Sequence, residues 1–503
     1  MTANKQDSAT PHYDALCAAF KQIHHFQHLQ ALGDWDQATM MPSGGSQGRG
    51  EAMAELALHI HTLKTAPSLV DNLSAADEEA LTASQKANLR EMRYHTLQAT
   101  ALPGELVQQK TALTYACEHA WRQQRKDNDW QGFRPNLEKV IALVREEAQI
   151  LGEVQDLSPY DALLNKFEPG CQTAALDKVF GELRTWLPEM IQQVQAKQQS
   201  WQKVIIPHSS AHAQQALNLD VMKLLGFDFN QGRLDTSSHP FSGGVPGDVR
   251  ITTRYDEADF ITSLYSTIHE VGHARYEQGL PIDWRGQPVG LARSMALHES
   301  QSLFFEMQLA RSPAMIALLA EKINQHLGAN LNTALSSESL THLVQRVTPG
   351  LIRVDADEVT YPCHIMLRYE VEKGLIDKSL QVADLPEFWD NQMQSLLGLS
   401  TRGDDRNGCM QDIHWPVGEL GYFPSYSLGA MYAAQFKASM VKALGDIDSL
   451  IEQGNITQVM DWLNQNIWSQ GSLLTTDELV TQVTGEVLNP VHFKRHLEQR
   501  YLS

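Results

Sequence analysis

Apolar residues recur at helical spacing over most of the chain. The period runs from about residue 12 to residue 155 and resumes after residue 258. It is clearest in one run of apolar positions separated by polar ones, namely Leu137, Val140, Ile141, Val144, Ala148 and Leu151. Such a period indicates helices with one buried face. The sequence therefore predicts a mainly α protein whose N-terminal part, residues 12–155, consists of long amphipathic helices.

One segment alternates with a period of two, as a β-strand does. In "DVRITTRY", residues 248–255, the side chains of Val249, Ile251 and Thr253 alternate with polar ones. A turn-rich run, "SSHPFSGGVPG", precedes it, and a polar loop, "TRGDDRNGCMQDIHWPVGE", interrupts the later helices at 401–419. We expect a small β-sheet inside a helical chain. Neither a repeat of 20 to 50 residues nor a low-complexity linker divides the sequence, so residues 1–503 are expected to form one unit.

Net charge, cysteine content and apolar run length limit which partners and which cellular compartment we expect for the protein. The 503 residues carry 60 acidic and 40 basic side chains, a net charge of −20, which argues against nucleic acid or an anionic membrane as a partner. Five scattered cysteines without a CxxC pair suggest neither a disulfide framework nor a cysteine metal site. Neither an apolar leader nor an apolar run of roughly 20 residues is present. We expect a cytoplasmic protein.

The run "STIHEVGHARYEQ", residues 266–278, carries the clearest candidate chemistry. Two histidines four residues apart, His269 and His273, project from one face of a helix and can bind the same metal ion. Glu270 would stand beside that ion, where a carboxylate can take a proton from water. The alternative is a chance pattern, because the chain has 20 histidines. The apolar spacing just upstream favours metal, since a buried histidine pair without a partner is costly.

A third ligand is expected from "SMALHESQSLFFEMQLA", residues 294–310. Glu299 is preferred, because it would complete a site of two histidines and one carboxylate that leaves a position open for water. His298 is a rival ligand, and Glu306 is a weaker one. Ser302 and Glu306 share the helical face of Glu299, and we interpret them as a hydrogen-bond donor to the ligands and a structural acid, respectively.

Recognition of a peptide end would need further groups. An arginine fork suits a free C-terminal carboxylate, and the candidates are Arg353 in "GLIRVDADEVTYPCHI" and Arg250 in "GDVRITTRY". For either one, a structural ion pair is the alternative. Negative charge on a reacting carbonyl oxygen would need donors, for which the loop after residue 408 supplies His414, Tyr422 and Tyr426. We take His414 and Tyr422 as candidate catalytic residues.

Taken together, these motifs resemble the carboxypeptidase Taq family of zinc metallocarboxypeptidases. The likeness rests on "HEVGH", "HESQS", "DVRIT", "IRVDADEVTY" and "GCMQDIHW", and extends to "WDQATMMP", "YDALLNKFEPG", "SSHPF" and "GYFPSYSLGAMYAAQF". It covers nearly the whole chain. The run after "HESQS" departs from the family pattern, which commonly continues with Arg and, a little later, an acidic residue followed by Asn. Here the run is Leu303, Phe304, Phe305, Glu306 and Met307, of which only Glu306 fits.

The resemblance implies a large helical peptidase with a cleft, related in architecture to neurolysin and angiotensin-converting enzyme. Residues 12–155 would roof that cleft, and residues 235–436 would form the active-site region with its small sheet. It also implies a homodimer that removes single residues from peptide C-termini with broad preference, usually sparing proline. The implied roles are Zn²⁺ ligands (Co²⁺ or Mn²⁺ as substitutes) for His269, His273 and Glu299, general base for Glu270, carboxylate recognition for Arg353 and Arg250, and cleft lining for Gln411 and Asp412.

Two other functions stay open at this point. Helical clefts with the same histidine spacing also cut peptides internally, which would make the protein an oligopeptidase. A protein of another class could bind peptides or metal without turnover. Glu270 disfavours this second alternative, because a binding protein has no need of a base at that position.

Overall fold

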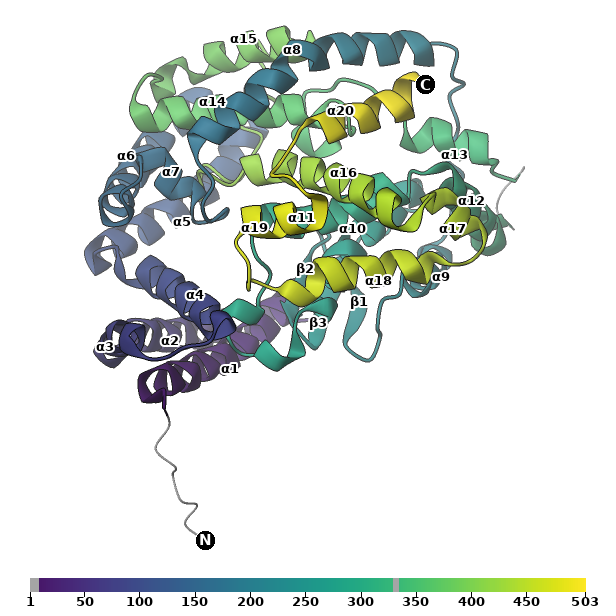
Figure 1. Cartoon of the computed structure of the whole chain (residues 1–503). Helices are drawn as coiled ribbons and strands as arrows, with labels where there is room; N and C mark the ends of the chain where they lie inside the picture. Colours follow the sequence, from purple (N-terminus) through teal and green to yellow (C-terminus); the bar gives the residue numbers. More distant parts are fainter. Residues whose placement is uncertain (1–8, 329–333) are drawn as a thin grey trace.

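Helices make up most of the structure, a computed structural model that describes residues 9–328 and 334–503 (Figure 1). The mainly α fold expected from the sequence is confirmed. The helices before the sheet are α1 (Pro11–Thr39), α2 (Ser46–Lys64), α3 (Pro67–Ala75), α4 (Ala83–Thr100), α5 (Gly104–Lys126), α6 (Trp130–Gln155), α7 (Pro159–Leu164), α8 (Thr173–Gln198) and α9 (Ala211–Leu224). Those after it are α10 (Phe260–Gly279), α11 (Met295–Leu303), α12 (Pro313–Leu327), α13 (Ser337–Val344), α14 (Tyr361–Asp377), α15 (Leu385–Leu397), α16 (Pro424–Leu444), α17 (Ile447–Glu452), α18 (Ile456–Asn466), α19 (Thr476–Thr484) and α20 (Val491–Leu497).

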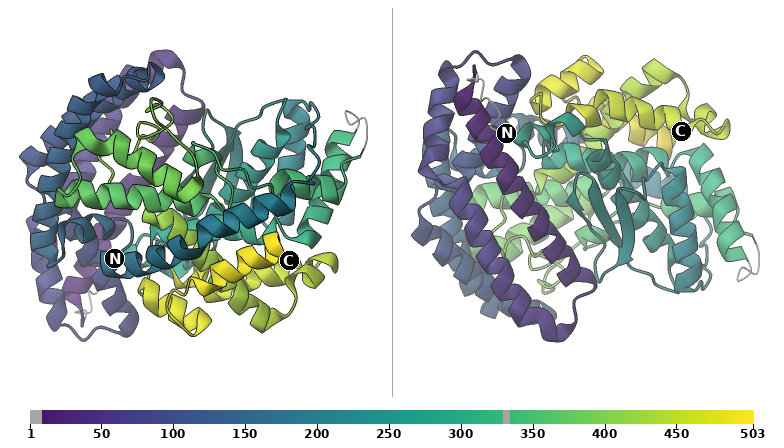
Figure 2. Two further views of the ribbon diagram at one scale, coloured as in Figure 1. Left: turned by 90° about the horizontal axis from the view of Figure 1, so that it is seen from above. Right: turned by 90° about the horizontal axis from the view of Figure 1, so that it is seen from below.

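The N-terminal helices α1 to α4 have a hydrophobic core of their own. In Figure 1 they lie together at one side of the molecule, and in Figure 2 α1 runs along one face beside the sheet. The remaining helices share a second, much larger core. Buried residues of the small core are Tyr13, Leu16, Phe20, Ile23, Ile60, Leu69, Leu73, Ala76, Leu89 and Met92.

In the described ranges, no single helix combines the length and apolarity needed to cross a membrane. One bent pair, Pro288–Leu309 with Pro313–Leu327, reaches those limits when its two parts are taken together.

The sheet has three strands in the order β1–β3–β2. They are β1 (Gly232–Thr236), β2 (Ser242–Val245) and β3 (Asp248–Thr253), with β1 parallel and β2 antiparallel to β3. The predicted strand is therefore confirmed as β3, although it ends at Thr253. The run 237–247 was expected to be only a turn, whereas part of it forms β2. Its Ser-Gly-Gly-Val sequence has little β propensity, and it is held in place by its pairing with β3.

A second difference concerns the segment 156–171, "DLSPYDALLNKFEPGC", whose proline and glycine residues predict a loop-rich joint before the next helix. It contains the short helix α7, which begins at Pro159 after the N-cap Ser158, whose side chain accepts a hydrogen bond from the backbone N–H of Asp161. Proline is well suited to the first position of a helix, because its missing N–H would have no partner there. The Pro residue that indicated a loop in the sequence is thus a helix start.

Helix α10 lies near the centre of the molecule (Figure 1). It begins after Asp259, whose carboxylate accepts hydrogen bonds from the backbone N–H groups of Ile261 and Thr262. Its buried face carries Phe260, Leu264, Ile268, Val271 and Ala274, a spacing of three and four residues that packs one side of the helix into the core. His269 and His273 lie on the same turns as Ile268, Val271 and Ala274, and the packing of these apolar residues fixes the position of the two histidines.

Two glycines allow α10, α11 and α16 to approach closely. A Cβ atom at Gly272 would lie 2.5 Å from the backbone oxygen of Gln301 and 2.5 Å from Cα of Ser302. On α16, a Cβ atom at Gly429 would lie 2.8 Å from Cβ of Glu299. All three distances are far below a normal contact. The absence of a side chain at these two positions therefore sets the spacing of the helices that carry the candidate metal ligands.

Replacement of Gly272 by alanine should lower the thermal unfolding midpoint, because the added methyl group meets backbone atoms that cannot move aside. We expect a loss of about 1–3 kcal/mol, the usual cost of overpacking a core. Gly181 on α8 is the matched control, since a Cβ atom there meets nothing within 4 Å. Gly181→Ala should stabilise the protein slightly, because alanine favours the helix. Equal midpoints for the two variants, measured by circular dichroism, would contradict the packing argument.

Candidate metal centre and substrate cavity

Helices α10 and α11 bring together the three predicted ligands. Candidate ligand atoms of His269, His273 and Glu299 all lie within 4.8 Å of one another. The two histidine Nε2 atoms face opposite oxygens of Glu299, at 4.0 Å for His269 and 3.5 Å for His273. Two imidazole nitrogens and one carboxylate are the donor set of many catalytic zinc sites. The residues present therefore fit a divalent metal ion.

Hydrogen bonds orient both histidine rings toward this point. Nδ1 of His269 lies 2.9 Å from Oε2 of Glu306, and Nδ1 of His273 lies 3.1 Å from the backbone oxygen of His298. A ring that donates through Nδ1 presents the lone pair of Nε2 to a metal ion. Glu306, expected to be a structural acid, thus positions a ligand. Ser302 donates its hydroxyl to the backbone oxygen of Glu299 within its own helix, so the expected contact with the ligand side chains is not observed.

Neither rival ligand belongs to the three-residue group. Nε2 of His298 lies 2.9 Å from Oε1 of Glu277, and its Nδ1 lies 2.6 Å from Nδ1 of His273. Glu306 accepts a second hydrogen bond, from Arg311 at 2.8 Å. Although burial alone would raise the pKa of Glu306, the bond from His269 and the charge of Arg311 hold it below its usual value. Glu306 is therefore negatively charged and strengthens His269 as a ligand.

The contact between Glu306 and His269 depends on an irregular turn. Glu306 lies in the π-helical segment η5 (Phe304–Leu309), which continues α11 with a wider turn. Such segments are rare and occur frequently at functional sites. The sequence gives no signal for η5, because its residues "FFEMQL" are ordinary helix-forming and apolar residues. The positioning role of Glu306 was missed for this reason.

Glu270 stands beside the three ligands and lines the same cavity. Its side chain is largely buried, with 8% of the residue surface exposed. Burial raises the pKa of Glu270 to about 7. A carboxylate with a pKa near neutrality can both accept and return a proton at physiological pH. This is the property expected of a general base.

The cavity above these residues has a volume of about 810 Å³. Its lining comes from positions between Pro240 and Ala430, with α10, α11 and the segment 353–362 as its main walls. Polar side chains at its wall include His269, Glu270, His273, His298, Glu299, Glu306, Arg353, Glu358, Tyr361, Tyr422 and Tyr426. Of the predicted site residues, the metal ligands, Glu270, Arg353 and Tyr422 thus share one space.

Arg353 is fixed at this wall by several partners. Its Nε donates to Oδ1 of Asp412 at 2.9 Å, and its Nη1 donates to the hydroxyl of Tyr361 at 2.7 Å. Its backbone N–H donates to Oε1 of Gln411 at 2.8 Å. The guanidinium also lies over the ring of Tyr426, 5.1 Å from its centre. Asp412 and Gln411 are not among the residues that line the cavity in the described chain; they contact Arg353 from outside it.

Arg250 lies elsewhere, on β3. Its guanidinium makes a two-point contact with Asp248, at 2.8 and 2.9 Å, and lies over the ring of Trp35 at 4.6 Å from its centre. It is absent from the described cavity lining. The structure therefore brings only one of the two predicted arginines to the metal residues, and a substrate-binding role of Arg250 stays a prediction.

His414 is partly buried beside the rings of Phe423 and Tyr422. Its ring lies 4.5 Å from that of Phe423 and 5.6 Å from that of Tyr422. Burial, together with the positive charge of Arg353, lowers the pKa of His414 to about 4, so the ring is neutral at pH 7. It does not line the cavity in the described chain, whereas Tyr422 does. Direct participation of His414 in catalysis stays a prediction.

Two cavity residues were not singled out from the sequence. Tyr361 was quoted within the motif "IRVDADEVTY" but given no role, and its hydroxyl accepts the bond from Arg353. Glu358 pairs with the C-terminal residues His496, Arg500 and Tyr501. For Glu358 the sequence carries no signal, because its partners are about 140 positions away.

Glu306→Gln should weaken binding of a divalent ion such as Zn²⁺ by about 10–100-fold, the usual effect of removing a carboxylate that orients a ligand histidine. Competition with a chromophoric chelator measures this affinity. Glu277→Gln is the control, because Glu277 contacts His298 and not one of the three ligands. Its affinity should stay close to wild type. The same loss in both variants would contradict the role given to Glu306.

Comparison with known sequences agrees with this geometry. The profile of the family described as "Carboxypeptidase Taq (M32) metallopeptidase" matches residues 15–501. Carboxypeptidase 1 of Bacillus subtilis is 34% identical over 487 residues, covering 96% of each chain. Thermostable carboxypeptidase 1 of Thermus thermophilus is 36% identical over 506 residues, covering 97% of this chain and 99% of the relative.

Solved structures that superpose on this chain are also carboxypeptidases. Metallocarboxypeptidase 1 of Trypanosoma cruzi superposes with a TM-score of 0.95 at 44% identity, covering 98% of this chain and all (100%) of the other. The M32 carboxypeptidase of Deinococcus radiodurans superposes with a TM-score of 0.93 at 31% identity, covering 98% of this chain and 99% of the other. By the match of the family profile over residues 15–501 and by its identity to these relatives, the chain belongs to the carboxypeptidase Taq family of metallopeptidases.

Proposed function

We propose that the protein is a zinc-dependent carboxypeptidase that releases single residues from peptide C-termini, with broad preference and little action on C-terminal proline. The observation that carries this proposal is the placement of Arg353 in the same cavity as Glu270 and the three metal-ligand residues. An enzyme that cuts at a peptide end needs both a hydrolytic centre and a partner for the terminal carboxylate. This cavity holds candidates for both.

The donor set supports zinc as the ion. His269, His273 and Glu299 would hold it, and Co²⁺ or Mn²⁺ could take its place, since neither demands a very different set of ligands. When bound, the ion supplies Lewis acidity, which polarises a peptide carbonyl and makes water easier to deprotonate. The remaining steps belong to the side chains of the chain itself.

Glu270 moves the proton in this proposal. Its carboxylate accepts a proton from the attacking water and then delivers it to the nitrogen of the departing amino acid. The pKa near 7 suits both halves of this exchange. Tyr422 and Tyr426, whose rings lie 5.2 Å apart at the cavity wall, carry hydroxyl groups that can donate to the carbonyl oxygen as its negative charge develops.

Arg353 selects which bond is cut. Asp412 and Tyr361 hold Nε and Nη1, which leaves Nη2 for the substrate carboxylate. The arginine is nearly buried, with 6% of its surface exposed, so its charge is poorly screened by water. A peptide whose terminal carboxylate pairs with Arg353 would present its last peptide bond to the metal-ligand residues. Internal cleavage, the alternative, would not need this pair.

Glu270→Gln should abolish turnover while metal content stays unchanged. The amide keeps the size of the carboxylate but cannot accept a proton, so kcat is expected to fall by about 10²–10⁴-fold. Hydrolysis of a short blocked peptide and metal analysis of the same sample measure the two effects. The exposed Glu257, exchanged for Gln, is the control and should keep full activity. Full activity of the metal-loaded Glu270→Gln protein would exclude Glu270 as the base.

Arg353→Lys should lower kcat/KM for peptides with a free C-terminus by at least tenfold, because lysine keeps the charge but loses the planar fork. Peptides with an amidated C-terminus should respond much less. Arg250→Lys, made in parallel, tests the other arginine and should leave both substrates unchanged. An equal loss for free and amidated peptides would contradict the role of Arg353.

Mass spectrometry of one digested peptide separates end trimming from internal cleavage. A ladder of single losses from the C-terminus is the expected result, because Arg353 holds the terminal carboxylate. Since little action on C-terminal proline is proposed, the ladder should stop before proline. Internal fragments would favour the oligopeptidase instead.

The cytoplasmic location and the homodimer expected from the sequence stay predictions. Size-exclusion chromatography with light scattering tests whether the protein is a homodimer.

A further inference from the structure

A second cavity of about 990 Å³ lies apart from the catalytic one and shares none of its lining residues. Helix α4, the segment 168–182, α16 and the C-terminal segment 475–490 form its walls. We call it the Arg293 cavity after the arginine at its inner end. Its size is at the upper end of the range for small-molecule sites. Nothing in the proposed peptide hydrolysis uses it.

Two guanidinium groups share one carboxylate at the inner end. Nη1 of Arg293 and Nε of Arg90 each lie 2.6 Å from the same oxygen, Oε1 of Glu91. Glu168 is the other acid at this end, and burial raises its pKa to about 7. It is also fully engaged, since it accepts hydrogen bonds from the backbone N–H of Ala296 and the hydroxyls of Ser294 and Thr476. The guanidinium groups of Arg293 and Arg90 thus share one close carboxylate, that of Glu91. Glu478 of α19 acts on both from farther away.

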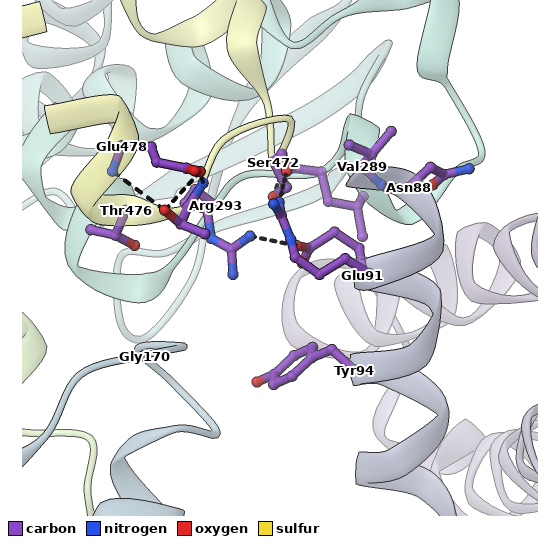
Figure 3. Close-up of polar contacts among 12 residues, drawn as sticks. Asn88, Glu91, Tyr94, Gly170, Val289, Arg293, Ser472, Thr476 and Glu478 are labelled. Atoms are coloured by element: carbon purple, nitrogen blue, oxygen red, sulfur yellow. Dashed lines mark hydrogen bonds and ion pairs between the residues drawn. The ribbon is translucent and has the colours of Figure 1, made fainter. Parts of the chain in front are cut away.

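The guanidinium of Arg293 has an N–H group without a partner. Arg293 is 6% exposed, and its Nε is buried with no hydrogen-bond acceptor. Figure 3 shows the guanidinium between Glu91 and the opening bounded by Gly170 and Tyr94. Because Nε is closed off from the cavity and Nη1 is bonded to Glu91, the nitrogen that faces the opening is Nη2. No described residue accepts a hydrogen bond from Nη2, and an anionic group in the cavity could do so.

The rest of the cavity is largely apolar. Side chains from α8, α16 and the C-terminal segment contribute this surface, namely Leu176, Val179, Leu428, Tyr432, Val487, Leu488 and Pro490. The other acids at the lining, Glu182, Asp477 and Glu486, are less buried than Glu91 and Glu168. They would repel a ligand that carries several negative charges. A single anionic group on an apolar body matches both regions.

We propose that the Arg293 cavity binds a small organic monocarboxylate with an apolar body, the carboxylate accepting hydrogen bonds from Arg293 and the body packing against Leu176 and Leu428. Two sources share this chemistry, an N-blocked apolar amino acid and a medium-chain alkanoate. The proposal does not depend on peptide hydrolysis, because it concerns binding alone.

Isothermal titration of the metal-loaded enzyme tests the proposal with four probes: N-acetylphenylalanine, its amide, octanoate and acetate. N-acetylphenylalanine or octanoate should bind at least tenfold more tightly than both the amide and acetate. The stronger of the two identifies the source. Acetate binding as tightly as the larger acids would indicate a simple anion site and overturn the proposal, as would equal binding of the amide.

Ala175→Trp separates this cavity from the catalytic one, where Arg353 can also bind carboxylates. Ala175 is exposed on α8 and lines the Arg293 cavity, so the indole should fill its mouth without disturbing the core. Affinity for the preferred acid should fall at least tenfold. Ala196→Trp, at an exposed position of the same helix outside the cavity, is the matched control and should bind as wild type does.

Arg293→Gln removes the charge and should cause the same loss of affinity. If this variant does not fold because Glu91 loses a partner, the two tryptophan variants decide the question alone. Both should hydrolyse peptides at the wild-type rate. Undiminished binding in Ala175→Trp would place the ligand elsewhere and overturn the proposal.

Discussion

The active site depends on one constraint, namely that polar groups buried in an apolar helical core must be paired. Helix α10 is packed on one side by aliphatic and aromatic residues, and this leaves the side chains of His269 and His273 only 23% and 14% exposed, so a ring nitrogen without a partner there would be costly. Each ring therefore uses Nδ1 to bind an oxygen of the protein. The same bonds that pay the cost of burial leave both Nε2 atoms facing Glu299. The Nδ1 hydrogen bonds of the two histidines thus both stabilise the core and orient the Nε2 atoms for a metal ion.

The same constraint explains how Arg353 is held. Asp412 is buried between Arg353 and Arg368, and it contacts both. Although burial alone would raise its pKa, the two guanidinium groups hold the pKa of Asp412 at about 2. Two positive charges then face one negative charge. The unmatched positive charge lies at the wall of the catalytic cavity, where a peptide carboxylate can neutralise it.

Local patterns were predictable from the sequence, and contacts between distant segments were not. The i, i+4 spacing placed His269 and His273 on one helical face, and alternation located β3, because both depend only on near neighbours. Strand β2 was not predicted, because Ser-Gly-Gly-Val becomes a strand only by pairing with β3. Glu306 was given too small a role because its contact with His269 needs the π-helical turn of η5.

The two arginines show the same limit. Both stand near acids in the sequence, so composition alone cannot rank them. Arg250 pairs with Asp248, only two residues away, and stays on the sheet. Arg353 pairs with Asp412, 59 positions further on, and not with the acids that neighbour it in the sequence. Only the fold reveals which partner an arginine takes, and that choice decides which guanidinium reaches the cavity.

Helix α11 connects the two cavities physically. Its N-cap, Ser294, directly follows Arg293, while Glu299 lies farther along the same helix. Glu168 binds the backbone N–H of Ala296 in the first turn, where an acidic group also interacts favourably with the helix dipole. Beside each cavity two guanidinium groups share a single buried carboxylate, which is Asp412 outside the wall of the catalytic cavity and Glu91 at the wall of the Arg293 cavity. Each arrangement leaves positive charge beside an enclosed space, and this is the condition under which a buried arginine selects a carboxylate from solution.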